Sequence, residues 1–218
     1  MPGLVYPTKC VLCGKLLSRD EIDLCHSCRI DSPEFIYAKR SIPFVAKWTA
    51  LWYYRDNVVK SIHNFKFCND RSSANPLGRL LADKLREDGL YEVCDLITWV
   101  PISRRRRFRR GYDQSELLAK VLAGELGLVP VKVLRKIRHN PPQSATHSVS
   151  SRKANVLGVY QALNRDQIAG KRILLIDDVL TTGATVSECA KILLTAGAQE
   201  VRVATVASSY HKNTNKYR

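Results

Sequence analysis

The chain has 218 residues, of which 45% are apolar and 25% charged, a composition typical of globular proteins. No segment approaches the roughly 18 consecutive apolar residues of a membrane-spanning helix, and no signal peptide is recognised, so we expect no membrane span and a cytoplasmic location. The net charge of +15 is uneven, because residues 101–153 hold 13 basic and 3 acidic side chains. This concentration favours a polyanionic partner, either a phosphate-rich small molecule or a nucleic acid, and a solubilising surface is the alternative.

Four of the seven cysteines form two C-x-x-C pairs near the amino terminus. Cys10 and Cys13 are followed, after eleven residues, by Cys25 and Cys28. Two such pairs at short separation can bring four thiolates onto one tetrahedral Zn²⁺ ion. Residues 1–32 contain too few large apolar side chains for a core of their own, so a structural zinc would supply the missing stability. We therefore predict a four-cysteine zinc module over residues 1–32. Disulfide bonds are the alternative, which a cytoplasmic location disfavours.

The remaining residues, 33–218, alternate between strand-like and helix-like patterns. Short apolar runs predict strands at 49–54, 96–100, 131–134, 172–176 and 201–206. Apolar residues at helical spacing predict helices at about 58–67, 77–85, 117–126 and 184–195. Strands separated by helices indicate an α/β domain, with a parallel sheet covered by helices on both faces. The three cysteines outside the C-x-x-C pairs stand singly among apolar residues, and we expect them to be buried: Cys68, Cys94 and Cys189.

Six arginines occupy the seven positions from 104 to 110, which we expect to form a loop. A pyrophosphate group would use two or three of them, and the others suit the phosphates of a nucleic acid. Aromatic side chains in and after the run are available to stack on unpaired bases. The predicted nucleic-acid residues are Arg104, Arg105, Arg106, Arg107, Phe108, Arg109, Arg110 and Tyr112. A solvated loop without function is the alternative.

The most specific chemical signal follows the apolar run 172–176. Asp177 and Asp178 come at its carboxyl end, where parallel sheets bind their ligands, and a Thr-Thr-Gly turn then opens into a helix. The backbone amides of such a turn attract phosphate, and Gly183 permits a close approach. Two carboxylates beside a phosphate require sugar hydroxyls or a divalent cation between them, so the pattern predicts a phosphorylated sugar. An ordinary acidic helix cap is the alternative.

Neighbouring side chains of a regular strand point to opposite faces of the sheet. Asp177 and Asp178 can therefore reach the same ligand only if the backbone departs from strand geometry at this point. We predict a bend there.

The motif at 173–185, with four apolar residues, two acids and Thr-Thr-Gly, resembles the phosphoribosyl-pyrophosphate (PRPP) motif of type I phosphoribosyltransferases. The segment 100–119, which contains Arg-Gly-Tyr-Asp-Gln at 110–114, resembles the signature of the ComF family of competence-associated, phosphoribosyltransferase-like proteins. The double C-x-x-C fits the same family, as do Gln143, Arg152, Asn155 and Gly158. The resemblance extends over essentially the whole chain. It departs from the family pattern at Asp113, where members usually carry Asn, and in the length of the arginine run.

The resemblance implies a type I phosphoribosyltransferase-like sheet over residues 33–218 and a role for each motif. Asp177 and Asp178 would hold the ribose hydroxyls of PRPP, directly or through Mg²⁺. The 5′-phosphate would lie against Thr181, Thr182, Gly183, Ala184 and Thr185. The pyrophosphate would lie against Pro101, Ser103 and Arg104. Transfer of the phosphoribosyl group would rest on stabilising the charge of the departing pyrophosphate, with Asp177, Asp178, Arg106 and Arg110 as the catalytic residues.

Two kinds of function are compatible with this resemblance. We favour a DNA-uptake protein that binds PRPP with Mg²⁺ and single-stranded DNA, with proteins of the uptake machinery as further partners. The alternative is an enzyme that transfers the phosphoribosyl group to a nucleobase or another nitrogen acceptor, as in nucleotide salvage. The sequence does not identify an acceptor, because we recognise no segment that would bind one.

Overall fold

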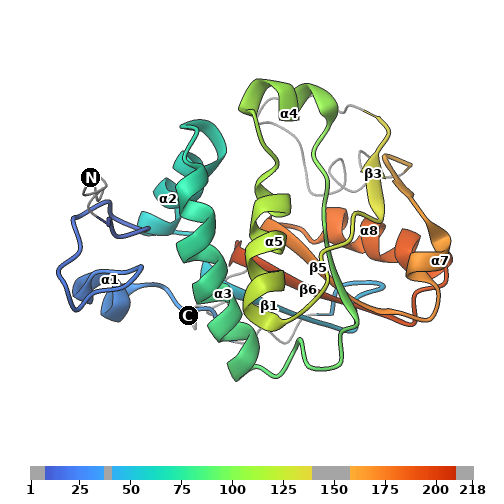
Figure 1. The fold of residues 1–218 in the computed structure, drawn as a ribbon, viewed down its shortest axis with the longest axis horizontal. Helices are drawn as coiled ribbons and strands as arrows, with labels where there is room; N and C mark the ends of the chain where they lie inside the picture. The colour runs from blue at the N-terminus through green and yellow to red at the C-terminus, as the bar shows by residue number, and fades with distance from the viewer. Residues whose placement is uncertain (1–7, 37–40, 139–157, 210–218) are drawn as a thin grey trace, which may run out of the picture.

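The computed structural model describes residues 8–36, 41–138 and 158–209. Within them, a central four-stranded sheet has the order β1-β6-β5-β2 (Figure 1). Its strands are β1 (Lys47–Tyr53), β6 (Glu200–Ser208), β5 (Arg172–Leu180) and β2 (Leu96–Trp99). Each neighbouring pair is parallel. The predicted α/β class with a parallel sheet is therefore confirmed.

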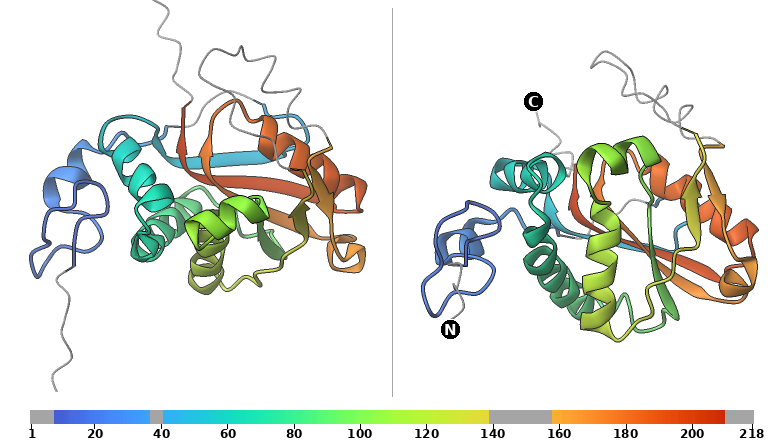
Figure 2. Two further views of the ribbon diagram at one scale, coloured as in Figure 1. Left: turned by 90° about the horizontal axis from the view of Figure 1, so that it is seen from above. Right: turned by 45° about the horizontal axis from the view of Figure 1, so that its top comes forward.

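Helices cover both faces of the sheet (Figure 2). On one side lie α2 (Asp56–Phe67), α3 (Ala74–Glu87) and α5 (Gln114–Leu126), and on the other lies α8 (Ala184–Thr195). The apolar residues of β5 alternate accordingly. Leu174 and Ile176 pack with the first group of helices, whereas Ile173 and Leu175 pack with α8. All the described helices fall short of the length and apolar character that a bilayer crossing requires.

A two-stranded antiparallel hairpin, β3 (Leu134–Lys136) and β4 (Tyr160–Ala162), packs beside α8. The strand predicted at 131–134 is therefore misplaced by about three residues. The residues before β3 run alongside β2 instead, where Pro130 forms an isolated bridge with Ile97. A short helix, α7 (Arg165–Ile168), links the hairpin to β5.

The amino-terminal segment lies at one end of the molecule, beside α2 and α3 (Figures 1 and 2). It contains one short helix, α1 (His26–Asp31). Arg79 of α3 donates from Nε to Asp23 Oδ2 at 2.9 Å, and its Nη2 pairs with the other carboxylate oxygen. Leu12 and Leu24 belong to the same apolar cluster as Leu51 and Trp52 of the sheet. The segment therefore packs against the larger domain through apolar contacts as well as an ion pair.

Two of the three single cysteines are buried as predicted, namely Cys94 and Cys189. The prediction for Cys68 is wrong, because this thiol is exposed. It immediately follows α2, where the amphipathic helix has ended and its residues no longer face the sheet.

Candidate functional site

The two aspartates form a half-buried carboxylate pair (Asp177 and Asp178) near the carboxyl end of β5. The strand does not end at them, because its pairing with β6 continues to Leu180. The alternation of side chains is nevertheless interrupted: Ile176 packs with the helices α2, α3 and α5, and so does Val179, three residues further on. The strand continues through both aspartates, so the predicted departure from strand geometry is not confirmed, and only the alternation of side-chain packing changes.

Both carboxylates of the pair contact helices of the same layer. Ser115 of α5 donates from Oγ to Asp177 Oδ1 at 3.1 Å, and the amide of Asp178 donates to the same oxygen at 2.9 Å. Lys66 Nζ of α2 lies 2.9 Å from Asp178 Oδ1. Burial raises the pKa of Asp177 to about 7, the charge of Asp178 adds to that rise, and Lys66 opposes it. The two carboxylates therefore form one negatively charged site, and the ammonium of Lys66 lies beside it.

The predicted phosphate cradle, 181–185, forms the turn between β5 and α8. Gly183 adopts a left-handed conformation with φ 78° immediately before the helix, which glycine tolerates without strain. The amide of Ala184 donates to Thr182 Oγ1 at 3.4 Å. Thr181 is exposed, and Ala184 and Thr185 are half-buried. The first-turn amides of α8 accordingly lie next to the carboxylate pair in the chain, on a twelve-residue helix whose dipole favours an anion.

The arginine run forms a helix, α4 (Arg104–Arg110), and the loop predicted there is wrong. Ser103 caps its first turn by accepting a hydrogen bond from the Arg106 amide at 3.4 Å, and Gly111 ends it with φ 78°. Arginine itself has a high helix propensity, so a serine and a glycine at the two ends suffice to define the helix. Figure 1 shows α4 at the edge of the molecule, between α2 and the β3–β4 hairpin.

Asp113, at the position where the sequence departs from the ComF pattern, is buried and organises the loop after β2. Its Oδ2 accepts from the Ile102 amide at 3.0 Å, and its Oδ1 accepts from the Glu116 amide at 3.3 Å. Burial raises the pKa of the Asp113 carboxyl. Pro101 and Ser103 are buried as well, so of the predicted pyrophosphate residues only Arg104 is exposed.

The side chains of α4 divide into two groups. Arg106 and Arg110 are half-buried, and the others are exposed. Arg110 donates from Nη1 to Gln114 Oε1 at 2.9 Å, and its guanidinium lies 4.7 Å from the centre of the Phe67 ring. Its Nε is buried and has no hydrogen-bond partner among the described residues. Burial lowers the pKa of Arg110, and the charge of Asp178 opposes this. Arg110 is therefore a donor held close to the carboxylate pair.

We call the residues that α4 directs to solvent its outer face: Arg104, Arg105, Phe108 and Arg109. The Phe108 side chain is 93% exposed, which is unusual for an aromatic residue. Arg107 is also exposed but pairs with Glu116, at 2.7 Å between Nη1 and Oε2. The outer face thus combines three arginines with an aromatic ring that α4 leaves uncovered.

The assignment of Tyr112 to nucleic-acid stacking is wrong. Its side chain is 5% exposed, and its hydroxyl donates to the backbone oxygen of Phe65. The guanidinium of Arg71 lies 5.1 Å from the centre of its ring. Tyr112 therefore anchors the turn between α4 and α5 to α2, and its ring is not available to a base.

Three residues near the carboxylate pair had no assigned role at the level of sequence: Lys66, Lys136 and Tyr160. Lys136 Nζ of β3 lies 3.3 Å from the Tyr160 hydroxyl of β4. Burial lowers the pKa of Lys136, while the charge of Asp177 opposes the change. No motif marks these residues, because each lies on an element other than β5, and Lys66 is more than 100 positions away from Asp178. The family-like positions Gln143, Arg152 and Asn155 lie outside the described residues.

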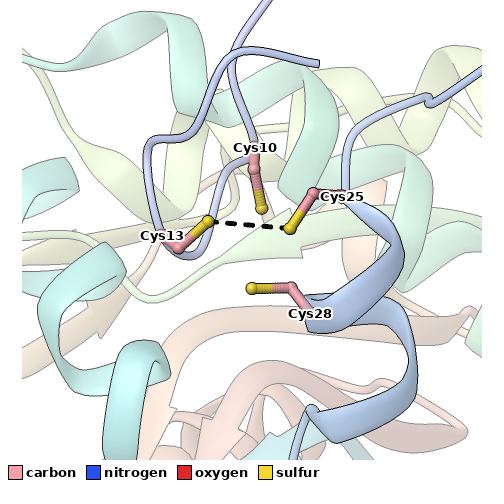
Figure 3. Close-up of side chains that lie close together, drawn as sticks. All are labelled: Cys10, Cys13, Cys25 and Cys28. Atoms are coloured by element: carbon pink, nitrogen blue, oxygen red, sulfur yellow. Dashed lines mark hydrogen bonds between the residues drawn. The ribbon is translucent and has the colours of Figure 1, made fainter. Parts of the chain in front are cut away.

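The four cysteines of the C-x-x-C pairs form a cysteine cluster (Cys10, Cys13, Cys25 and Cys28) (Figure 3). All four sulfurs lie within 4.8 Å of one another, and those of Cys13 and Cys25 are 3.7 Å apart. A tetrahedral ion with metal–sulfur distances of about 2.3 Å places its ligand sulfurs about 3.8 Å apart. Burial disfavours the Cys10 thiolate, but backbone amides outweigh burial and lower its pKa to about 7. The cluster could therefore bind one metal ion.

The chain is similar to proteins of known name. Residues 113–218 match the family model described as the phosphoribosyl transferase domain. The chain is 30% identical over 205 residues to the DNA utilization protein YhgH of Salmonella typhimurium, covering 89% of this chain and 87% of that protein. It is 29% identical over 163 residues to competence protein F of Haemophilus influenzae, covering 72% of this chain and 70% of that protein. A solved structure of glutamine PRPP amidotransferase from B. subtilis, 27% identical, superposes with a TM-score of 0.44 over 62% of this chain and 26% of that chain.

Proposed function

Because the chain belongs to the ComF family of competence-associated, phosphoribosyltransferase-like proteins, we propose that it binds PRPP with Mg²⁺ and single-stranded DNA, and acts in DNA uptake in the cytoplasm. The PRPP site lies at the carboxyl end of β5, and the DNA lies on the outer face of α4. Proteins of the uptake machinery are further partners in this proposal. The names of the relatives refer to DNA utilization and competence, and these names support a role in DNA uptake.

The carboxylate pair is the observation that carries the PRPP proposal. Two carboxylates on adjacent residues contact helices of one layer, and they lie beside a turn that opens into α8. Carboxylate oxygens accept hydrogen bonds from the vicinal hydroxyls of a ribose, and they are also ligands that Mg²⁺ prefers. The amides after Gly183 would bind the 5′-phosphate, and Arg104 and Arg110 would bind the pyrophosphate. When bound, Mg²⁺ would neutralise part of the charge of the pyrophosphate.

The outer face of α4 supports the DNA proposal. Its three arginines suit phosphates of a single strand, and the ring of Phe108 offers a surface on which a base can stack. Arg107 contributes less, since Glu116 already neutralises it. If three phosphates are bound, affinity for single-stranded DNA should fall about 20-fold between 50 and 200 mM salt.

The cysteine cluster supports a structural role for zinc in this proposal. Four cysteine sulfurs at tetrahedral spacing are the donor set typical of structural Zn²⁺ sites. Residues 1–32 then form the zinc module and residues 33–218 the phosphoribosyltransferase-like domain. The ion pair between Asp23 and Arg79 joins the two.

An enzyme that transfers the phosphoribosyl group to a nitrogen acceptor is the second candidate. The half-buried Arg106 and Arg110 favour it, and the unpaired Nε of Arg110 is a donor that a leaving pyrophosphate could use. Release of pyrophosphate from PRPP in the presence of nucleobases, lost in the Asp178→Asn variant, would support this function.

The PRPP site is tested by calorimetry with Mg²⁺ and PRPP. The Asp178→Asn variant should bind PRPP about 10- to 100-fold more weakly, because a charge-assisted hydrogen bond contributes about 1.5–3 kcal/mol. The matched control is Asp166→Asn, which removes an exposed carboxylate on α7 and should leave affinity unchanged. Equal affinities of the two variants would refute the site.

A further inference from the structure

The ion pair between Lys66 and Asp178 joins α2 to the motif that follows β5. Lys66 Nζ lies 2.9 Å from Asp178 Oδ1, and the two side chains are 21% and 14% exposed. Lys66 occupies the last turn of α2, more than 100 positions from Asp178 in the chain. No sequence motif includes this lysine. Its ammonium is the only cationic group that the structure, over its described ranges, shows in an ion pair with the carboxylate pair.

The helix α2 has contacts with the sheet that do not involve this ion pair. The helix α2 is already held against the sheet by Val58, Ile62 and Phe65, each at most 1% exposed. The backbone oxygen of Phe65 also accepts the hydrogen bond from Tyr112. Both side chains of the pair are largely buried, so loss of the lysine would leave the Asp178 carboxylate without its cation in a site partly withdrawn from water. The direct effect of Lys66 is therefore on the charge of the Asp178 carboxylate, which its ammonium partly neutralises.

The electrostatics of a PRPP site explain why a lysine belongs there. PRPP carries phosphate charges at both ends of the sugar, and two carboxylates must approach the hydroxyls between them. Like charges at such distances repel, and the repulsion strengthens in a site partly withdrawn from water. An ammonium on Asp178 neutralises one of the two carboxylates. It also leaves acceptor positions, because each carboxylate oxygen has two lone pairs and Nζ occupies one of them.

We propose that Lys66 is a positioning residue of the PRPP site: its ammonium neutralises and orients the Asp178 carboxylate, so that this carboxylate can accept the ribose hydroxyls beside the phosphates of the ligand. The inference rests on the proposed function. It assigns Lys66 to the sugar end of the site, through Asp178, and not to the pyrophosphate. Because the sugar end and the pyrophosphate end of PRPP are assigned to different residues, ribose 5-phosphate and pyrophosphate can be used separately to test the inference.

The test compares Lys66→Gln, which removes the charge, with Lys66→Arg, which keeps it. The matched control is Lys60→Gln, which removes an exposed lysine of the same helix. The probes are PRPP with Mg²⁺, ribose 5-phosphate without metal, and pyrophosphate with Mg²⁺, each followed by calorimetry. Circular dichroism and the melting temperature verify that every variant folds.

Lys66→Gln should weaken binding of both PRPP and ribose 5-phosphate about tenfold, as expected when one partner of a hydrogen-bonded charge pair is lost, and should leave pyrophosphate binding unchanged. Lys66→Arg should restore most of the affinity, and Lys60→Gln should bind all three probes like the unaltered protein. The double variant Lys66→Gln with Asp178→Asn should bind no more weakly than Asp178→Asn alone, because the lysine acts through that carboxylate.

Three results would overturn the inference. Lys66→Gln could bind PRPP as well as Lys60→Gln does, or it could lose pyrophosphate binding by the same factor as PRPP binding, which would assign Lys66 to the phosphates. Additive losses in the double variant would show that Lys66 acts independently of Asp178. If the unaltered protein bound neither PRPP nor ribose 5-phosphate, the proposed function would fail first, and the role of Lys66 with it.

Discussion

In the cysteine cluster, Cys13 and Cys25 are 12 positions apart in the chain, whereas at the end of β5 Ser115 contacts Asp177 across 62 positions. The cluster is built from two short turns of one segment. We call the carboxylate pair, together with the side chains that contact it, the strand-end site, and it combines β5 with an ammonium from α2 and a hydroxyl from α5. The first kind of site depends on local spacing, and the second depends on the packing of the whole domain.

The two regions should therefore respond differently to damage. With zinc bound as proposed, loss of a ligand from the cysteine cluster should remove a major stabilising interaction of its segment, because that segment has little apolar core of its own. Loss of a side chain at the strand-end site leaves a sheet whose strands are stabilised by buried apolar residues on both faces. The following predictions test this difference, from the largest expected effect to the smallest.

Removal of the metal should affect the amino-terminal segment far more than the sheet. We expect about one zinc per chain, lost in the Cys10→Ser variant, because structural zinc contributes on the order of 10–16 kcal/mol in small peptides. Amide exchange in residues 8–32 should become fast, while β5 and β6 stay protected. Metal analysis and hydrogen-exchange mass spectrometry measure both effects.

Cys68→Ser is the matched control for Cys10→Ser, since it removes an exposed thiol outside the cluster. It should retain the metal and the exchange pattern. A Cys10→Ser protein that kept a full equivalent of zinc, or in which the sheet lost protection together with the segment, would contradict the separation of the two regions.

Charge reversal on the outer face of α4 should separate DNA binding from PRPP binding. Arg105→Glu with Arg109→Glu removes two exposed guanidiniums and should weaken binding of a single-stranded oligonucleotide about 30-fold near 100 mM salt. PRPP affinity should change by less than about threefold, because both side chains are exposed to solvent and salt, whereas Arg110 is half-buried. Fluorescence anisotropy and calorimetry give the two affinities.

The control for this charge reversal is Arg165→Glu with Lys171→Glu, an equal change of charge at two exposed positions near α7. It should have a much smaller effect on oligonucleotide binding. If the α4 variant lost affinity for PRPP and for the oligonucleotide by equal factors, both ligands would share one site, and the division of α4 into two faces would be wrong.

Asp113 should give the smallest effect, on the pH dependence of stability. Burial raises the pKa of this carboxyl in the folded protein above its unfolded value, so the folded state retains the proton more strongly. Its contribution to stability is therefore largest at acidic pH and decreases as the pH rises through the folded pKa. The free energy of unfolding, measured with urea at pH 5 and pH 7.5, should favour the unaltered protein over Asp113→Asn more at the lower pH. A difference that is equal at both pH values, or larger at pH 7.5, would contradict this origin.

Several features were predictable from the sequence because neighbouring residues determine them. The C-x-x-C spacing predicts the cysteine cluster, since each pair needs only a tight turn to direct two sulfurs inward. The apolar run and the Thr-Thr-Gly turn predict β5 and the start of α8. Each of these features depends on residues close together in the chain, whose relative positions the local backbone geometry determines.

Other features depended on contacts that only the folded chain creates. Tyr112 is held in the interior because the backbone oxygen of Phe65, 47 positions away, accepts a hydrogen bond from its hydroxyl. The strand β3 begins late because Pro130 first pairs beside β2. Lys66 reaches Asp178 because α2, which follows the edge strand β1, packs in the same apolar cluster as α5, the helix that contacts Asp177. The amino-acid sequence by itself determined the chemical groups and their local geometry. The tertiary structure decided which distant groups meet, because strand order and helix packing bring together residues that no local pattern relates.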